Sequence, residues 1–178
     1  MSERGISELM QALYRGETER VAELRGARPE LDVFEAAALG DLERLRTLLD
    51  ADPALVGAWS ADGFTPLHFA AFFGHPDAAG LLIERGADLE VPARNEEIAG
   101  AARPLHSATA AGQREVCVVL LDAGADVNAR QQAGYTPLLE AAQLGDSRLV
   151  ELLLEHGADR TATLDDGRGL GDLGQIDL

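Results

Sequence analysis

The chain has 178 residues and a hydrophobic content of 46%, which suits one folded domain with a core of its own. Its 31 acidic side chains outnumber its 15 basic ones, and the formal charge of -16 argues against nucleic acid or an anionic membrane as a partner. Every basic residue is an arginine, which excludes chemistry that needs a lysine, such as Schiff-base formation or a phosphate-binding loop.

The single cysteine, Cys117, lies in the apolar run VCVVLL, so we expect a core residue in a reducing cytoplasm. The first residues, MSERGISELM, do not have the pattern of a secretory signal, and no apolar run approaches the roughly 20 residues of a membrane span. We therefore predict a cytoplasmic protein. Arginine without lysine, together with abundant alanine, is typical of a GC-rich bacterial genome, such as that of an actinobacterium.

The N-terminal part of the chain predicts two helix pairs. The segments LYRGETERVAEL (13–24) and ALGDLERLRTLLDADPALV (38–56) each have a glycine between two helix-forming runs. Gly16 and Gly40 are closer together in the sequence than the corresponding glycines further along, Gly112 and Gly145. We therefore expect no projecting turn after the first pair, which would be an atypical cap.

The middle of the chain repeats one motif. TPLHFAAFFGH (65–75) returns as RPLHSATAAGQ from Arg103 and as TPLLEAAQLGD from Thr136. A repeat of about 33 residues indicates a solenoid, and the motif resembles the ankyrin repeat. The resemblance implies a single all-α domain over residues 1–178, an ankyrin-repeat solenoid of about five helix pairs with projecting β-turns. The expected pairs cover residues 5–30, 31–58, 59–91, 103–129 and 130–163.

Two places break the repeat. Gly74 and Gly112 are further apart than Gly112 and Gly145, so five extra residues lengthen the turn at 91–103 and bring Arg94 to Ile98 beside the phenylalanines of 65–75. This long turn is either a binding loop or an insertion without a role, because lengthening a loop costs little. Residues 164–178 begin like another repeat but are rich in glycine, so we expect a degenerate partial cap or a frayed tail.

The four histidines have structural interpretations. His68 and His106 belong to the PLH motif, in which the ankyrin resemblance implies that the imidazole bonds neighbouring turns. His75 follows a helix-ending glycine, and His156 lies in the last turn of a helix. No metal-binding motif is present, and we expect no metal and no cofactor.

The first helix of each pair contributes to the concave face in the ankyrin fold. The side chains expected on this face are Gln11, Tyr14 and Arg15; Glu35, Ala38 and Leu39; Phe69, Phe72 and Phe73; Ser107, Ala110 and Ala111; and Glu140, Gln143 and Leu144. Three phenylalanines therefore lie at its centre, with Phe64 on the adjoining turn. Alternatively, Phe69 and one neighbour pack between repeats, which leaves one ring partly exposed.

Glu35 and Glu140 occupy corresponding places on either side of the phenylalanines. A carboxylate beside an apolar surface can acquire a raised pKa, which would suit a general acid or base. We expect instead that both are solvated charges, and the repeats between them prevent a close pair.

The resemblance implies a non-enzymatic scaffold that holds a protein or peptide on its concave face and projecting turns. The acidic charge favours a basic or amphipathic partner. The predicted binding residues are Trp59, Asp62, Phe64, Phe69, Phe72, Phe73, Arg94, Arg103, His106, Tyr135 and Glu140.

Two alternatives remain open. In one, the groove under the 91–103 turn holds a hydrophobic small molecule and promotes its rearrangement or cyclisation, as a cofactor-independent cyclase or isomerase with Glu140 or His106 as acid or base. In the other, the chain self-associates through the end where the final repeat fails.

Overall fold

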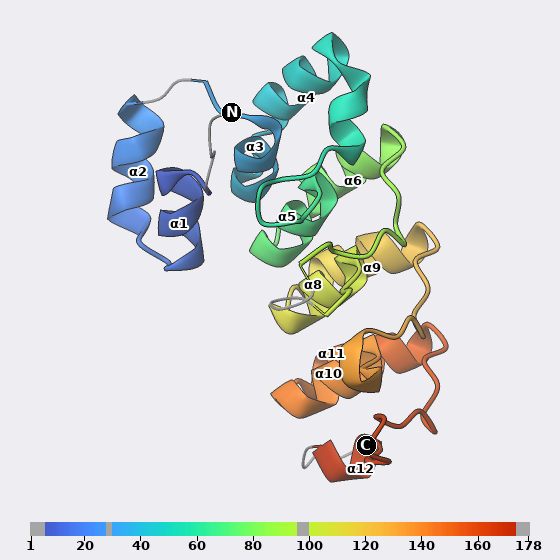
Figure 1. Ribbon diagram of the computed structural model, residues 1–178. Coiled ribbons are helices and arrows are strands. Elements are labelled where there is room, and N and C mark those ends of the chain that lie inside the picture. The colour runs from blue at the N-terminus through green and yellow to red at the C-terminus, as the bar shows by residue number, and fades with distance from the viewer. Residues whose placement is uncertain (1–5, 28–29, 96–99, 174–178) are drawn as a thin grey trace.

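The computed structural model describes residues 6–27, 30–95 and 100–173, and these residues form a curved stack of helix pairs (Figure 1). The pairs are α1 (Glu8–Tyr14) with α2 (Thr18–Ala27), α3 (Val33–Leu39) with α4 (Leu42–Ala51), α5 (Pro66–Phe73) with α6 (Pro76–Glu84), α8 (Pro104–Ala110) with α9 (Arg114–Asp122), and α10 (Pro137–Leu144) with α11 (Ser147–Glu155). Short helices η1 (Pro53–Gly57), η2 (Gln132–Gly134) and α12 (Leu170–Leu173) complete them. The described residues contain no strand, so the predicted all-α solenoid is confirmed.

The repeated motif fixes where each first helix begins and ends. Thr136 is the N-cap of α10, and its Oγ1 accepts the Leu139 N–H at 3.3 Å, while Pro137 occupies the first helical position. The same helix ends at Gly145, whose φ of 70° is the left-handed conformation that favours glycine. α5 follows the same plan, from Pro66 to a left-handed Gly74. The chain can therefore reverse after two turns of helix and place the second helix against the first.

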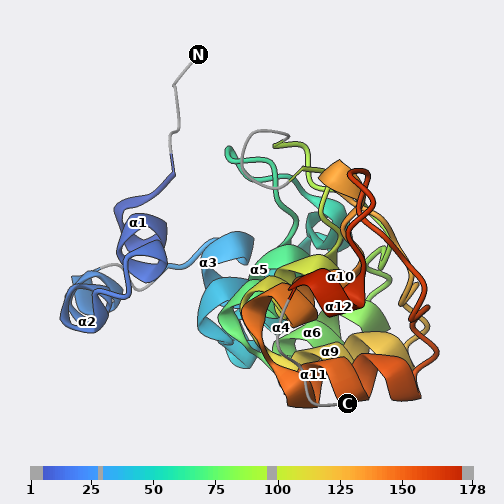
Figure 2. The same ribbon diagram turned by 90° about the horizontal axis from the view of Figure 1, so that it is seen from below.

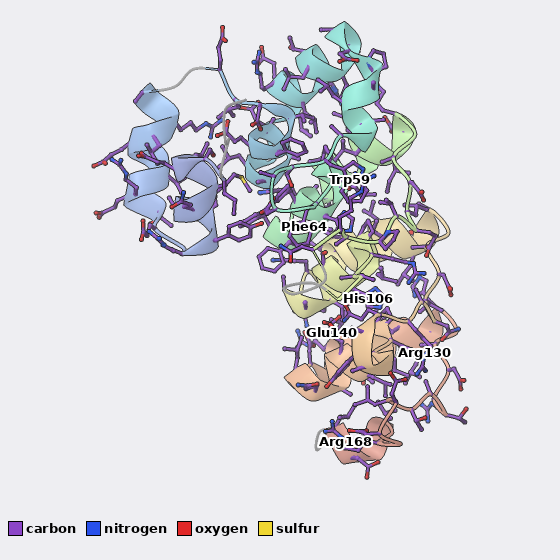
Figure 3. All side chains as sticks on the ribbon, viewed as in Figure 1. Trp59, Phe64, His106, Arg130, Glu140 and Arg168 are labelled. Atoms are coloured by element: carbon purple, nitrogen blue, oxygen red, sulfur yellow. The ribbon has the colours of Figure 1, made fainter. Side chains whose placement is uncertain are left out.

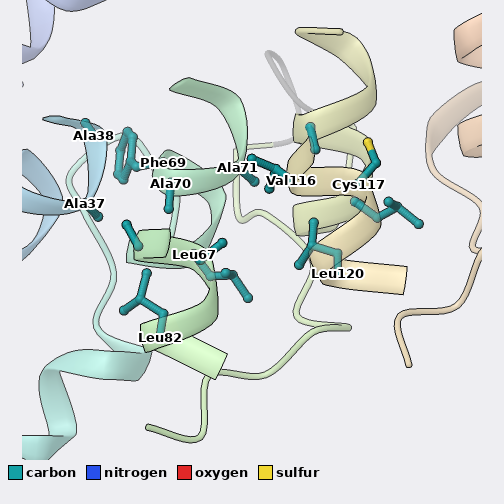
Figure 4. Close-up of a cluster of buried hydrophobic side chains, with 14 of the residues drawn as sticks. Ala37, Ala38, Leu67, Phe69, Ala70, Ala71, Leu82, Val116, Cys117 and Leu120 are labelled. Carbon is teal, nitrogen blue, oxygen red and sulfur yellow. The ribbon is translucent and has the colours of Figure 1, made fainter. Parts of the chain in front are cut away.

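The core runs through the stack as one cluster of small and branched side chains. Figure 4 shows part of it. Leu67, Leu82 and Leu120 are fully buried, and Ala70 and Ala71 let α5 approach its neighbours closely. Cys117 lies in the same core and is 0% exposed, as its apolar context predicted. Burial raises the pKa of its thiol to about 12, so the thiol is inert at neutral pH.

Histidines bond one repeat to the next, which confirms their structural interpretation. His68 Nε2 donates to the Ala102 carbonyl at 3.1 Å, and its Nδ1 accepts from the Thr65 hydroxyl at 2.8 Å. His106 donates from Nε2 to the Ala129 carbonyl at 3.1 Å. Burial lowers the pKa of both imidazoles to about 4, so both are neutral at physiological pH.

The N-terminal pair α1–α2 stands to one side of the stack, as the view from below shows (Figure 2). Side-chain hydrogen bonds from Ser7, the N-cap of α1, and from Tyr14, its last residue, connect this pair to later elements. The Ser7 hydroxyl donates to Glu35 at 2.7 Å, and the Tyr14 hydroxyl donates to Asp62 at 2.8 Å. The second bond links the first pair to the turn that precedes α5, two repeats further along the chain.

The C-terminal part forms a partial cap. A bridge between Thr163 and Gly169 closes a tight turn, after which α12 packs against α10. α12 has only four residues, and the described part of this segment agrees with the degenerate partial repeat that the sequence predicted. Among the described helices, none is both long and apolar enough to cross a membrane.

Candidate functional site

Two adjoining hollows open on the face formed by α5, α8 and α10 and the turns that precede them. The first, of about 430 Å³, has Phe64, Phe72, His106, Gln131, Tyr135 and Glu140 among its lining residues, and we call it the Glu140 hollow. The second, of about 310 Å³, is lined mainly by Ile6, Tyr14, Phe64, Phe69 and Phe72, and we call it the Tyr14 hollow. Both include Phe64, Phe72 and Ser107, so the two hollows form one groove.

An aromatic cluster forms the apolar end of the groove. The Tyr14 ring lies 6.3 Å from Phe72 and 5.6 Å from Phe73, and the Phe72 and Phe73 rings meet edge to face at 5.2 Å. Phe64 and Phe69 lie 5.9 Å apart beneath them. These separations are favourable for aromatic pairs, so the rings hold one another in place before any ligand arrives.

The prediction that three phenylalanines lie on the concave surface is wrong for Phe69, which is 2% exposed. It packs against Phe34, whose ring centroid is 5.9 Å away, because it lies at a position where α3 and α5 meet. Phe73 is half-buried against the core, whereas Phe72 is 39% exposed. The alternative interpretation, with one ring left partly exposed, describes the structure.

Tyr14 is expected on the concave face from its position, but it is absent from the predicted binding residues. It lies two residues before Gly16, just as Phe72 lies two residues before Gly74, and this shared spacing is the signal that could have found it. The residue as a whole is 42% exposed, while partial burial of its hydroxyl and the bond to Asp62 raise the pKa of that hydroxyl. Tyr14 therefore remains a neutral donor at the rim of the groove.

The first part of the long turn is anchored to the turn that precedes α5, and Gly100, near its other end, accepts the Gln132 N–H at 2.8 Å. The Arg94 guanidinium lies 3.9 Å from the centre of the Trp59 ring, and the Arg94 N–H donates to the Gly63 carbonyl at 2.9 Å. The Asn95 amide donates to the Asp62 carbonyl at 3.1 Å. The predicted residues Glu96, Glu97 and Ile98 lie outside the described residues.

Arg103 and His106 serve the scaffold. Arg103 Nε lies 3.1 Å from Glu90 Oε2, and one of its terminal nitrogens donates to the Arg130 carbonyl at 3.0 Å. His106 uses Nε2 for the Ala129 carbonyl, and its Nδ1 accepts the Arg103 N–H at 3.3 Å. Since both ring nitrogens are engaged, His106 has no free position from which to act as an acid or base.

The expectation that Glu35 and Glu140 are solvated charges is wrong. Glu35 is 2% exposed, accepts from the Ser7 hydroxyl, and closes a capping box by accepting the Asp32 N–H at 3.1 Å. Glu140 lies inside the Glu140 hollow, between α8 and α10 (Figure 3). Burial raises the pKa of the Glu140 carboxyl to about 7, against the smaller opposite effect of the Gln131 hydrogen bond.

The two oxygens of Glu140 have different surroundings. Oε1 accepts the Gln131 amide at 3.3 Å. Oε2 is buried and has no hydrogen-bond partner among the described residues. Gln131 carries no distinctive sequence signal, because its importance depends on the turn that folds back to the Tyr135 carbonyl. No group of three or more potential metal ligands occurs within the described part of the chain.

Comparisons with known proteins agree with the repeated architecture. A family model described as ankyrin repeats in three copies matches residues 7–93, 33–131 and 93–164. The chain is 39% identical over 156 residues to neurogenic locus notch homolog protein 4 of Homo sapiens, which covers 87% of this chain and 7% of that protein. It is 34% identical over 149 residues to ankyrin repeat and SAM domain-containing protein 6 of Mus musculus, covering 79% of this chain and 16% of that protein. The human ankyrin repeat and SOCS box protein 6 is 40% identical over 111 residues, covering 58% of this chain and 25% of that protein. The chain thus spans a quarter or less of the length of these relatives.

Proposed function

The chain belongs to the ankyrin-repeat family, whose members commonly mediate protein–protein binding, and from that premise we propose a non-enzymatic module that binds a segment of a partner protein in the groove. The observation that carries this proposal is the half-exposed Phe72 ring, which both hollows share. Aromatic side chains, phenylalanine included, are enriched in protein interfaces relative to the rest of the surface.

The expected affinity follows from the apolar area of the groove. Burying an aromatic ring contributes about 1.5–3 kcal/mol. A micromolar Kd needs about 8 kcal/mol of net binding free energy. Phe72, Tyr14 and Tyr135 can therefore supply a large part of a micromolar interaction, and the formal charge of -16 favours a basic or amphipathic partner.

A display library of random peptides, selected on the purified protein, tests this proposal and does not require the natural partner to be identified first. We expect Phe72→Ala to weaken the selected peptides about tenfold, because truncating the ring loses roughly 1.4 kcal/mol or more of burial. The matched control is Leu144→Ala on α10, because Leu144 is 53% exposed and lines neither hollow. Calorimetric or fluorescence titration gives the three dissociation constants.

If the two variants weaken binding equally, or if neither does while both remain folded by circular dichroism, the groove is not the binding site. A selection that enriches no peptide would contradict the module itself. Neither result depends on the cellular compartment of the protein.

We propose that this compartment is the reducing cytoplasm, because Cys117 is buried and forms no disulfide.

A second candidate function rests on the size and lining of the Tyr14 hollow. Its volume of about 310 Å³ falls at the lower end of the range of small-molecule pockets, and aromatic rings form most of its wall. Beside it, a Glu140 carboxyl with a pKa of about 7 could exchange a proton near neutral pH. Such a site would suit rearrangement or cyclisation of a hydrophobic molecule without a cofactor.

Native mass spectrometry of the protein isolated from its host separates the two functions. A stoichiometric small mass that is lost on denaturation would favour the small-molecule site, and its absence from the Phe72→Ala variant would locate it in the groove. A co-purified polypeptide at defined stoichiometry would favour the interaction module. In either case the Leu144→Ala variant should keep the same bound small molecule or polypeptide as the unmodified protein, because Leu144 lies outside both hollows.

A further inference from the structure

The Glu140 carboxylate is incompletely paired inside the groove. Oε1 has the Gln131 amide at 3.3 Å, while Oε2 is buried and has no hydrogen-bond partner among the described residues. A buried carboxylate oxygen that lacks a donor loses its hydration without compensation. A cationic donor would compensate this loss best, because charge-assisted bonds are roughly twice as strong as neutral ones.

Three arginines of the turns around the groove lie beside carboxylates other than Glu140. Arg103 Nε lies within ion-pair distance of Glu90 Oε2, at 3.1 Å, although it makes no hydrogen bond within the described residues. Arg130 is paired with Asp165 at 3.0 Å, and Arg168 with Asp166 at 2.8 Å. None of the three lines the Glu140 hollow. Within the described residues, no arginine reaches Oε2, so this oxygen is open to a cation supplied by a partner.

The remaining wall of the Glu140 hollow suits a long basic side chain. Phe64, Phe72 and Tyr135 present aromatic surface, and Ser107 and Ala110 leave space between α8 and the rings. Lysine and arginine bury an aliphatic stem along such a surface and carry the charge at its end. The adjoining Tyr14 hollow is almost wholly apolar and can receive an uncharged side chain of the same segment.

We propose that the groove selects a partner segment by two side chains, a lysine or arginine whose charged end pairs with Glu140 Oε2 and an apolar side chain that fills the Tyr14 hollow. This inference rests on the proposed binding function and specifies the chemistry of the partner. The overall charge of -16 attracts a basic segment to the molecule at long range. Glu140 then determines where the basic side chain of that segment binds.

The proposal implies that binding depends on pH. The charged and titratable groups on the elements packed against α10 are His106 on α8, Arg148, Glu151 and Glu155 on α11, and Asp172 on α12. Of these groups, only His106 lines the hollow, where Tyr135 from the preceding turn joins it. His106 has a pKa of about 4 and stays neutral above pH 6, so Glu140 is the group that changes charge between pH 6 and 8.

The direction of the pH effect follows from the proton on Glu140. With a pKa of about 7, the carboxyl is mostly protonated at pH 6 and mostly ionised at pH 8. Only the ionised form pairs with a cation, and lysine keeps its charge throughout this range. We therefore expect affinity for a basic segment to rise about tenfold from pH 6 to pH 8, which is the change in the ionised fraction.

The experiment starts from the peptides selected by display on the unmodified protein. We expect them to share a lysine or arginine near an aromatic or aliphatic residue. Replacing that basic residue by norleucine in the synthetic peptide, which leaves the protein untouched, should weaken binding about tenfold or more. The same loss should follow from Glu140→Gln, which keeps the shape of the side chain and removes its charge.

The control for net charge is Glu151→Gln, since Glu151 is exposed on α11 and lines neither hollow. It should leave both the affinity and its rise with pH unchanged, whereas Glu140→Gln should abolish the rise. Selected peptides without a basic residue, or equal effects of the two glutamine variants, would overturn the cation site. If Phe72→Ala still weakens those peptides, the groove remains the binding site and only this inference fails.

Discussion

Glu35 and Glu140 have different roles because the helices that carry them differ in length by one residue. Each carboxylate lies five residues before the glycine that ends its helix. α3 has seven residues and α10 has eight, so Glu35 falls on the third helical position and Glu140 on the fourth. At the third position a glutamate can reach back to the N-cap N–H, and Glu35 does so. Glu140 points into the groove instead.

The raised pKa of Glu140 predicts a pH-dependent cost to the folded state. Between pH 4.5 and 7 the folded protein holds this proton while the unfolded chain releases it, so rising pH favours unfolding over that window. Glu140→Gln removes the effect. We expect the variant to gain about 1–3 kcal/mol in unfolding free energy relative to the unmodified protein between pH 4.5 and pH 8.

Urea denaturation of both proteins at several pH values measures this difference. The difference in unfolding free energy between Glu140→Gln and the unmodified protein should increase as pH rises to 7 and stay constant above pH 7. Glu151→Gln, which removes one exposed charge on α11, serves as the control and should show no comparable divergence. A constant difference between Glu140→Gln and the unmodified protein at every pH would contradict burial of the carboxyl.

The sequence predicted the side chains that its repeated motif constrains and failed where packing decides. His68 and His106 were interpreted correctly because the PLH motif fixes their distance from the next turn. Phe69 and Phe72 are three residues apart on one helix face, yet one is buried by Phe34 and the other is not. That distinction depends on how closely α3 approaches α5, which residue spacing along one helix does not specify.

At the scale of the helix pair, the glycine that ends each first helix controls the reversal of the chain. Gly74 has a φ of 80°, and a Cβ at this position would collide with the Gln113 amide, which donates to the Phe72 carbonyl at 3.2 Å. Gly80 lies within α6 and has nothing within 4 Å of the place of its missing Cβ. Replacing glycine by alanine should therefore have opposite effects on stability at these two positions.

We expect Gly74→Ala to destabilise the protein by about 1–2 kcal/mol, because alanine is strained in the left-handed region. Gly80→Ala should stabilise it by about 0.5–1 kcal/mol through the higher helix propensity of alanine. Thermal denaturation followed by circular dichroism measures both changes. Shifts of the same sign in the two variants would contradict the assigned backbone conformations.

Helix ends were the part of each element that the sequence predicted best. Thr-Pro pairs and glycines are local signals, since a cap and a left-handed residue act within one turn of the helix. The placement of α1 was not predictable in the same way. The short spacing between the first two helix-ending glycines indicated a missing turn, but the contact of Tyr14 with Asp62 and Phe72 comes from the resulting position of the whole pair.

At the scale of the whole molecule, a solenoid distributes stability over contacts between neighbouring repeats. The N-terminal pair departs from this pattern, because Tyr14 also bonds to the turn before α5. Tyr14→Phe removes the hydroxyl and keeps the ring. We expect a loss of about 1 kcal/mol, the usual net contribution of one hydrogen bond.

Hydrogen exchange followed by mass spectrometry can locate that loss. Amide exchange in α1 and α2 should accelerate in Tyr14→Phe, while α10 and α11, which lie toward the other end of the stack (Figure 1), serve as the internal control. Equal acceleration along the whole chain would mean that the N-terminal pair does not unfold separately. Unchanged exchange in α1 and α2 would show that the bond to Asp62 contributes nothing to their attachment.

The Tyr14 hollow has one wall on the N-terminal pair and the other on α5. An occupant of this hollow would therefore add a contact between the N-terminal pair and the rest of the stack. In a nearest-neighbour chain, such a contact increases the cooperativity of unfolding. In the free protein the N-terminal helix pair would unfold in an early step, whereas the complex would unfold in a single transition. The width of the thermal unfolding transition would therefore show whether the hollow is occupied.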